Sequence, residues 1–206
     1  MKLNSLGRSK LQNIQKIIID LLKQNKNEKA IEISKQAIKK YPDESEYYSL
    51  IALAYMFINN NTAAIESINK ALNLEKKSHY FSNKSLILMQ INSFTDAVFA
   101  AEQAIEINPK NPEAFHNKSL ALVRLKKYSE AIEPGIKAIE LEPRLHQAYT
   151  NVGVAYSKIG LLKKSIDYYE RSLELEKNNL DVLNNLGVAY IKLKKMNWLK
   201  SILMKH

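Results

Sequence analysis

Apolar residues recur along this chain in a pattern that repeats about every 34 residues. Within residues 146–179, Tyr149, Val152 and Tyr156 have the spacing of one helical face, and Gly160 follows where a helix can end cheaply. A second run of apolar and small residues, again at helical spacing, comes after that glycine. This pattern predicts two short helices joined by a tight turn. Neither helix can bury its apolar stripe alone, so the pair needs neighbours.

The same pair recurs before and after this stretch. Small residues mark one position of most first helices and two positions of each second helix, in three columns: Ala52, Ser85, Ser119, Gly153 and Gly187; Ala30, Ala64, Ala97, Ala131 and Ser165; Ala37, Ala71, Ala104, Ala138 and Ser172. Small side chains let two helix backbones approach closely. Pro42, Pro109 and Pro143 close three of the second helices, because proline cannot continue a helix. Such a fixed period indicates a helical solenoid.

These units resemble tetratricopeptide repeats, which are helix–turn–helix units stacked into a superhelix. The resemblance implies an all-α fold, a right-handed superhelical solenoid of antiparallel helix pairs with about five full repeats and a partial sixth. We place a basic lead-in at 1–10 and a repeat domain at 11–206, divided into repeats at 11–44, 45–77, 78–111, 112–145, 146–179 and a partial 180–206. Ile18 makes the first repeat atypical, because a small residue is usual there.

Three local features modify this plan. The first helix is expected to begin at Leu11. Pro134 and Gly135 interrupt the second helix of the fourth repeat, so we expect a bend or local weakness there. After Tyr190 the repeat pattern is lost, although residues 197–204 keep an amphipathic turn or two. Two interpretations fit this end, a capping helix over the last stacked face or a chain cut short.

The net charge of +10 is concentrated at the two ends of the chain. Residues 1–44 carry +5 and residues 180–206 carry +4, so the middle is nearly balanced. A nucleic-acid binder usually has a continuous basic stripe with interleaved aromatics, so this distribution argues against nucleic acid as the partner. The N-terminal ten residues lack the apolar core of a secretory signal, and no apolar run is long enough to span a bilayer. We therefore expect a cytoplasmic protein.

The sequence shows no catalytic or cofactor motif. HExxH, GxxxxGK[ST], GxGxxG and CxxC are all missing, and the absence of cysteine excludes disulfides and thiolate metal sites. The four histidines lie in different repeats without i, i+4 pairs, at His79, His116, His146 and His206. We therefore expect a non-enzymatic protein with no catalytic residues, no metal and no other cofactor.

Polar residues form a regular pattern on the first helices of the third to sixth repeats. An amide ladder recurs every 34 residues and consists of Asn83, Asn117, Asn151 and Asn185. The helical period turns these amides away from the core of their own pair, toward a face that lines a concave groove in tetratricopeptide repeats. The same face carries a polar ladder of Gln90, Arg124, Lys158 and Lys192, and an apolar strip of Leu86, Leu120, Val154 and Val188.

An amide both donates and accepts hydrogen bonds, so a row of amides suits a peptide backbone, and the adjacent cations suit acidic side chains or a terminal carboxylate. We therefore predict a protein–protein interaction scaffold that binds an extended or helical peptide segment, an acidic one included, in its concave groove. The amide ladder resembles that of the repeat arm of O-linked N-acetylglucosamine transferases. The carboxylate clamp of chaperone-binding repeat proteins matches only in part, because no repeat has the required lysine–arginine pair. The alternative role for the amides is hydrogen bonding between neighbouring helices.

Two further interpretations stay open. The irregular end after Tyr190 also suits the repeat arm of a larger or truncated enzyme, such as a glycosyltransferase like the O-linked N-acetylglucosamine transferases. End faces without good caps would leave apolar surface that favours self-association.

Overall fold

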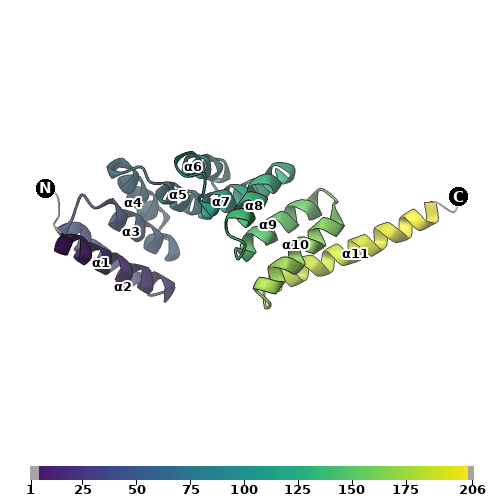
Figure 1. Ribbon diagram of the computed structural model, residues 1–206, viewed down its shortest axis with the longest axis horizontal. Coiled ribbons are helices and arrows are strands. Elements are labelled where there is room, and N and C mark those ends of the chain that lie inside the picture. Colours follow the sequence, from purple (N-terminus) through teal and green to yellow (C-terminus); the bar gives the residue numbers. More distant parts are fainter. Residues whose placement is uncertain (1–4, 204–206) are drawn as a thin grey trace. The chain divides into compact units, whose positions relative to one another are not determined.

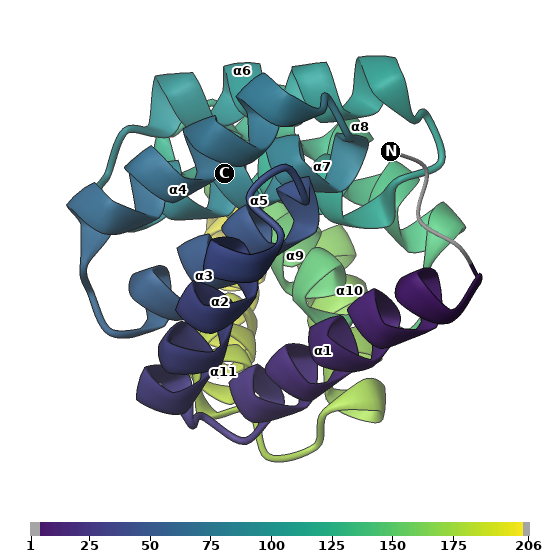
Figure 2. The ribbon, with the colours of Figure 1, turned by 90° about the vertical axis from the view of Figure 1, so that its left-hand side faces the viewer.

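The computed structural model describes residues 5–203, and the regular structure in that range is entirely helical (Figure 1). The helices are α1 (Ser5–Lys23), α2 (Asn27–Lys40), α3 (Ser45–Phe57), α4 (Asn61–Leu74), α5 (Ser78–Gln90), α6 (Phe94–Ile107), α7 (Pro112–Arg124), α8 (Tyr128–Leu141), α9 (His146–Lys158), α10 (Leu162–Leu175) and α11 (Leu180–Leu203). They form two compact halves, Met1–Ile107 and Asn108–His206. Within each half, consecutive helices pack as antiparallel pairs, as α1 and α2 show in Figure 2.

In each of the five complete pairs, the turn between the two helices contains one residue with a positive φ angle. The φ angles are 56° at Asn25, 60° at Asn59, 60° at Asn92, 61° at Lys126 and 84° at Gly160. These positions recur with the repeat, and asparagine and glycine tolerate this conformation best. The turn chemistry therefore follows the period that the apolar residues show.

The last helix departs from this plan. Lys194 lies 34 residues after Gly160, where a sixth turn is due, but α11 continues through it to Leu203. The sequence after Lys194 lacks the small residues that let a second helix pack closely against the first. The cost of a left-handed residue at Lys194 would therefore not be offset by packing of a second helix. Continuing the helix adds one backbone hydrogen bond per residue instead. The predicted partial sixth repeat therefore contains one long helix within the described residues.

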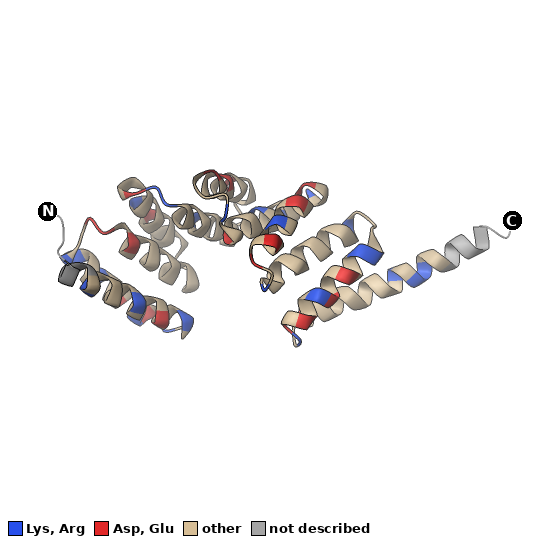
Figure 3. Cartoon of the chain, viewed as in Figure 1, with Lys and Arg blue, Asp and Glu red and all other residues tan. Residues whose placement is uncertain are grey.

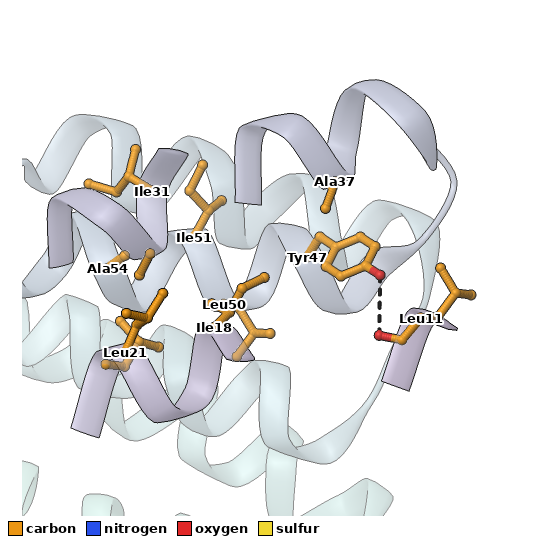
Figure 4. Packing of buried hydrophobic residues seen from close by; sticks show 11 residues of the cluster. Leu11, Ile18, Leu21, Ile31, Ala37, Tyr47, Leu50, Ile51 and Ala54 are labelled. Atoms are coloured by element: carbon orange, nitrogen blue, oxygen red, sulfur yellow. Dashed lines mark hydrogen bonds between the residues drawn. The ribbon is translucent and has the colours of Figure 1, made fainter. Parts of the chain in front are cut away.

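The first helix also differs from expectation. It begins at Ser5, so the predicted start at Leu11 is wrong. The Leu11 carbonyl accepts a hydrogen bond from the Tyr47 hydroxyl at 3.3 Å, and both residues belong to the core in Figure 4. This core holds the chain in place at Leu11, and between Ser5 and Lys10 only Gly7 has poor helix propensity. Burial raises the pKa of Tyr47 to about 12, since the charged phenolate cannot be solvated there.

Two positions at the centre of each helix pair are tightly packed and never both hold a large residue. A Cβ added to Gly153 would lie 2.7 Å from the Tyr169 ring, and one added to Gly135 would lie 2.8 Å from the Ser119 hydroxyl. The equivalent positions of the first three repeats are also fully buried and hold Ile18 with Ser34, Ala52 with Ile68, and Ser85 with Ala101. In three of these pairs a large residue on one helix meets a small one on the other. In Ser85 with Ala101 and in Ser119 with Gly135 both residues are small, so no pair is overpacked.

This complementarity explains the atypical first repeat. Ile18 replaces the usual small residue on α1, and Ser34 supplies the small residue on α2. Both side chains are 0% exposed, and the Ser34 hydroxyl donates to the Ala30 carbonyl at 2.7 Å, so the buried oxygen has a partner. The first repeat therefore keeps the packing plan with the two sizes exchanged.

Helix α8 runs continuously from Tyr128 to Leu141 with Pro134 inside it. The expected local weakness stays a prediction, but the structure gives Gly135 a packing reason. A Cβ at Gly135 would overlap the Val152 side chain on α9 as well as the Ser119 hydroxyl on α7. The glycine lets α8 approach both neighbours.

Alanine at Gly135 is expected to destabilise the protein by about 1 kcal/mol, because the overpacking outweighs the roughly 1 kcal/mol gain in helix propensity. Gly187→Ala, measured in dilute protein where the chain is monomeric, is the matched control, since a Cβ there would meet no described atom of the same chain within 4 Å. We expect that control to stabilise the protein by up to about 1 kcal/mol. Urea unfolding monitored by circular dichroism measures both. A stabilised Gly135→Ala variant would contradict the packing argument.

Candidate functional site: the first-helix faces

The predicted site residues lie on four first helices. Asn83, Leu86 and Gln90 belong to α5 in the N-terminal half. The other nine lie in the C-terminal half on α7, α9 and α11, and α9 packs against both of the other helices. That half therefore brings together Asn117, Leu120, Arg124, Asn151, Val154, Lys158, Asn185, Val188 and Lys192.

Several of the predicted amides bind the first helix of the preceding repeat. Asn83 donates from Nδ2 to the Ser49 hydroxyl at 2.9 Å. Gln90 donates from Nε2 to the Met56 carbonyl at 2.9 Å and to the Asn59 side-chain oxygen at 2.8 Å. These contacts join α5 to α3. The alternative role for the amides, bonding between neighbouring helices, therefore operates at Asn83 and Gln90.

The amides of the C-terminal half are largely covered. Asn117 is 6% exposed and Asn151 is 7% exposed, while Asn185 is half-buried. The Asn151 Nδ2 atom lies 3.4 Å from Nδ1 of His116, which is again on the preceding first helix. With so little surface, Asn117 and Asn151 offer an incoming peptide few hydrogen bonds. Their role in binding stays a prediction.

The polar ladder and the apolar strip are more accessible. Gln90, Arg124, Lys158 and Lys192 are all exposed. Leu86, Leu120 and Val154 are half-buried, and Val188 is 41% exposed. In the C-terminal half, three cations therefore stand at equivalent positions of adjacent helices, beside a row of apolar side chains.

His116 is the perturbed titratable group of this face. Burial, together with the neighbouring His146, lowers the pKa of His116 to about 4, since a charged imidazole would be poorly solvated there and repelled. His116 is therefore neutral at pH 7. The buried Nδ1 atom of His146 has no hydrogen-bond partner among the described residues. Across those residues, no cluster of three or more His, Asp or Glu side chains is arranged to hold a metal ion.

A polar cluster in the N-terminal half was not found by the sequence analysis. It joins the start of α5 to α3 and consists of Ser45, Glu46, Glu75, Lys77, His79 and Tyr80. The fully buried Tyr80 hydroxyl lies 2.8 Å from the Ser45 hydroxyl and donates to Glu46 at 3.1 Å. The His79 Nε2 atom lies 3.1 Å from the same carboxylate. The side chains of His79 and Tyr80, both on α5, therefore contact the same carboxylate of Glu46.

Titration shifts follow from this geometry. Burial would raise the pKa of Glu46, but the hydrogen bonds from His79 and Tyr80 outweigh it and the pKa is lowered. Burial raises the pKa of Tyr80 to about 12. The periodic columns carried no signal for this cluster, because its members are specific to one junction between repeats. Its contacts join consecutive repeats and are those of a structural cluster.

The described helices include none with both the length and the apolar character needed to cross a membrane. A family model described as the Psidin N-terminal tetratricopeptide-repeat region matches residues 88–205, and one described as a tetratricopeptide repeat matches residues 45–78. The comparison with curated protein sequences gave no match.

Solved structures of repeat proteins resemble the chain. TTC0263, a thermophilic tetratricopeptide-repeat protein of Thermus thermophilus, has a TM-score of 0.74 at 16% identity, covering 87% of this chain and 98% of its own. MamA has a TM-score of 0.65 at 25% identity, covering 80% and 97%. The first repeat domain of Spaghetti (RPAP3), bound to the HSP90 peptide SRMEEVD, has a TM-score of 0.56 at 27% identity, covering 58% and 94%.

The predicted fold class is confirmed by the helical pairs and by these structures. Such repeats form protein–protein interaction scaffolds. One family model matches more than half of the 206 residues of the chain, so the chain belongs to the tetratricopeptide-repeat family.

Proposed function

We propose that the first-helix face of the C-terminal half binds an acidic peptide segment. The observation that carries the proposal is the exposed column of Arg124, Lys158 and Lys192 on the adjacent helices α7, α9 and α11. Cations at this spacing suit carboxylates spread along a peptide, and the arginine can also hold one carboxylate through two hydrogen bonds. Leu120 and Val154 beside them suit apolar side chains of the same peptide.

A similar structure supports this class of partner. The repeat domain of RPAP3 is described as bound to SRMEEVD, a peptide with two adjacent glutamates and a final aspartate. Its 27% identity extends over 58% of this chain. An acidic peptide is therefore the first partner class to test here.

The amide ladder takes a supporting role in this proposal. Asn151 lies within hydrogen-bond reach of His116 on the preceding first helix, and both Asn117 and Asn151 are nearly covered. We infer that Asn151 sets the spacing between α7 and α9 through this contact. That spacing in turn determines how far apart Arg124 and Lys158 stand.

Reversing the three charges, with Arg124→Glu, Lys158→Glu and Lys192→Glu together, is expected to weaken binding at least about tenfold, since attraction to carboxylates becomes repulsion. The probes are peptides selected on the wild-type chain from a displayed random library with free carboxyl ends, with SRMEEVD as a reference. Fluorescence anisotropy measures the dissociation constants. The selected peptides are expected to be enriched in aspartate and glutamate.

The control carries the same change in net charge at exposed lysines away from the column. Lys110→Glu, Lys163→Glu and Lys177→Glu meet this condition. Circular dichroism checks that both triple variants keep their helices. Selected peptides without acidic enrichment, or equal losses in the two variants, would overturn the proposal. The matches to RPAP3 and TTC0263 are described as repeat proteins and do not favour the alternative of a glycosyltransferase arm.

A further inference from the structure

Helix α11 is covered on one side. Val182 and Ala189 are 0% exposed and belong to a core with Ile166 and Tyr169 of α10. Around the rest of the helix, large apolar side chains face solvent, and Leu180 and Ile191 lie about half a turn from the covered side. Their exposed fractions are 78% at Leu180, 45% at Leu183, 41% at Val188, 48% at Tyr190 and 70% at Ile191.

The equivalent side of α9 shows what is missing. There α10 covers the helix, and a Cβ on Gly153 would lie 2.7 Å from the Tyr169 ring. A Cβ on Gly187, the matching residue of α11, would meet no described atom within 4 Å. Because α11 continues where the other first helices turn, no second helix among the described residues packs on this side.

We propose that this open face, defined by Leu180, Leu183, Gly187 and Ile191, binds α11 of a second copy of the chain in antiparallel orientation. The four residues follow one another at intervals of three or four, which forms a continuous stripe on a helix. Gly187 lies at its centre and allows two helices to cross closely. A two-fold axis at Gly187 places Leu183 opposite Ile191 of the second copy.

Charge selects this orientation. Asp181 lies near the start of α11, whereas Lys192 and Lys195 lie beyond its midpoint, within roughly 60° of Asp181 around the helix. Figure 3 shows the later described part of α11 with basic and no acidic colour. In an antiparallel pair the same flank of each helix faces the other, so each Asp181 meets Lys192 and Lys195 of the second copy. A parallel pair would bring lysines level with lysines, and its helix dipoles would repel.

Lys192 belongs both to the proposed peptide site and to the flank of this interface, so the interface is tested at residues outside the peptide column. The variant Leu183→Glu with Ile191→Glu changes two exposed side chains, so its fold should persist. Sedimentation velocity of the full chain over a range of concentrations is expected to show a reversible dimer. The double variant is expected to raise the dimer dissociation constant at least about tenfold. Ile159→Glu with Leu161→Glu, at residues 37% and 46% exposed on the turn before α10, is the control and should still dimerise.

Cysteine cross-linking tests the orientation, since the natural chain has no cysteine. Gly187→Cys is expected to form a disulfide-linked dimer on mild oxidation, because the two copies of this residue face each other. Leu180→Cys is expected not to cross-link to itself, because an antiparallel pair separates its two copies by about 20 Å along the helix. A wild-type chain that stays monomeric at all concentrations would overturn the proposal. Efficient cross-linking by Leu180→Cys without cross-linking by Gly187→Cys would overturn the antiparallel pairing.

Discussion

Isoleucine at Gly153 is expected to destabilise the protein by about 3 kcal/mol. A Cβ alone would lie 2.7 Å from the Tyr169 ring, and that tyrosine is 2% exposed, so its ring has no free space to move into. Overpacking of a filled core typically costs about 1–3 kcal/mol, and a branched side chain against an aromatic ring belongs at the upper end. Urea unfolding followed by circular dichroism measures the loss.

The first repeat suggests the rescue. There isoleucine and serine occupy the two positions that hold Gly153 and Tyr169 in the fifth repeat. Tyr169→Ser alone is expected to lose about 3 kcal/mol or more, because it leaves a cavity. The double variant Gly153→Ile with Tyr169→Ser should be more stable than either single variant, since each change fills or vacates the space of the other. Additive losses in the double variant would show that the two positions do not share one volume.

Acidification is expected to weaken the C-terminal half through His116. Its pKa is about 4 in the folded chain against about 6.5 unfolded, so the unfolded state binds a proton that the folded state rejects. This contribution is absent above about pH 6.5 and grows as pH falls from about 6.5 toward 4. Between pH 7 and pH 5 the free energy of unfolding should fall by about 2 kcal/mol from this residue.

The comparison of two histidine variants isolates that effect. His116→Gln keeps a side chain that can accept from Asn151 but does not titrate, so its stability should fall less than that of the wild type over the same pH interval. His79→Gln is the comparison from the other half of the chain: it removes the 3.1 Å contact with Glu46 but leaves the surroundings of His116 unchanged. The measurement is urea unfolding at several pH values. Parallel pH profiles for His116→Gln and the wild type would rule out His116 as the cause.

Much of the fold was predictable because its determinants are local. Each helix pair contacts mainly its neighbours, so columns such as Ala30, Ala64 and Ala97 report packing directly. From its column alone, Ile18 looks too large for its position. The column does not show that the small Ser34, on the other helix of the pair, leaves room for it. A column follows one position, whereas packing depends on the two side chains that meet there.

The ends of the chain were harder to predict for a related reason. An internal first helix ends at a turn because the second helix that follows packs against it and stabilises the turn. At Lys194 the expected turn has no second helix to stabilise it, so α11 continues. At the start, the core around Leu11 supports a helix that already begins at Ser5. Periodicity locates a repeat but does not measure how well its outer neighbour supports it.

The amino-acid sequence by itself determined the helix pairs, their period and the family, because these depend on side chains close together along the chain. It also placed Asn83, Asn151 and the exposed cations on one face of their helices. Only the tertiary structure decided which of them reach solvent. Asn83 and Asn151 turn to the preceding first helix, whereas Arg124 and Lys158 are exposed. That difference depends on the separation of first helices in consecutive repeats, a distance set by packing between repeats and by no single repeat.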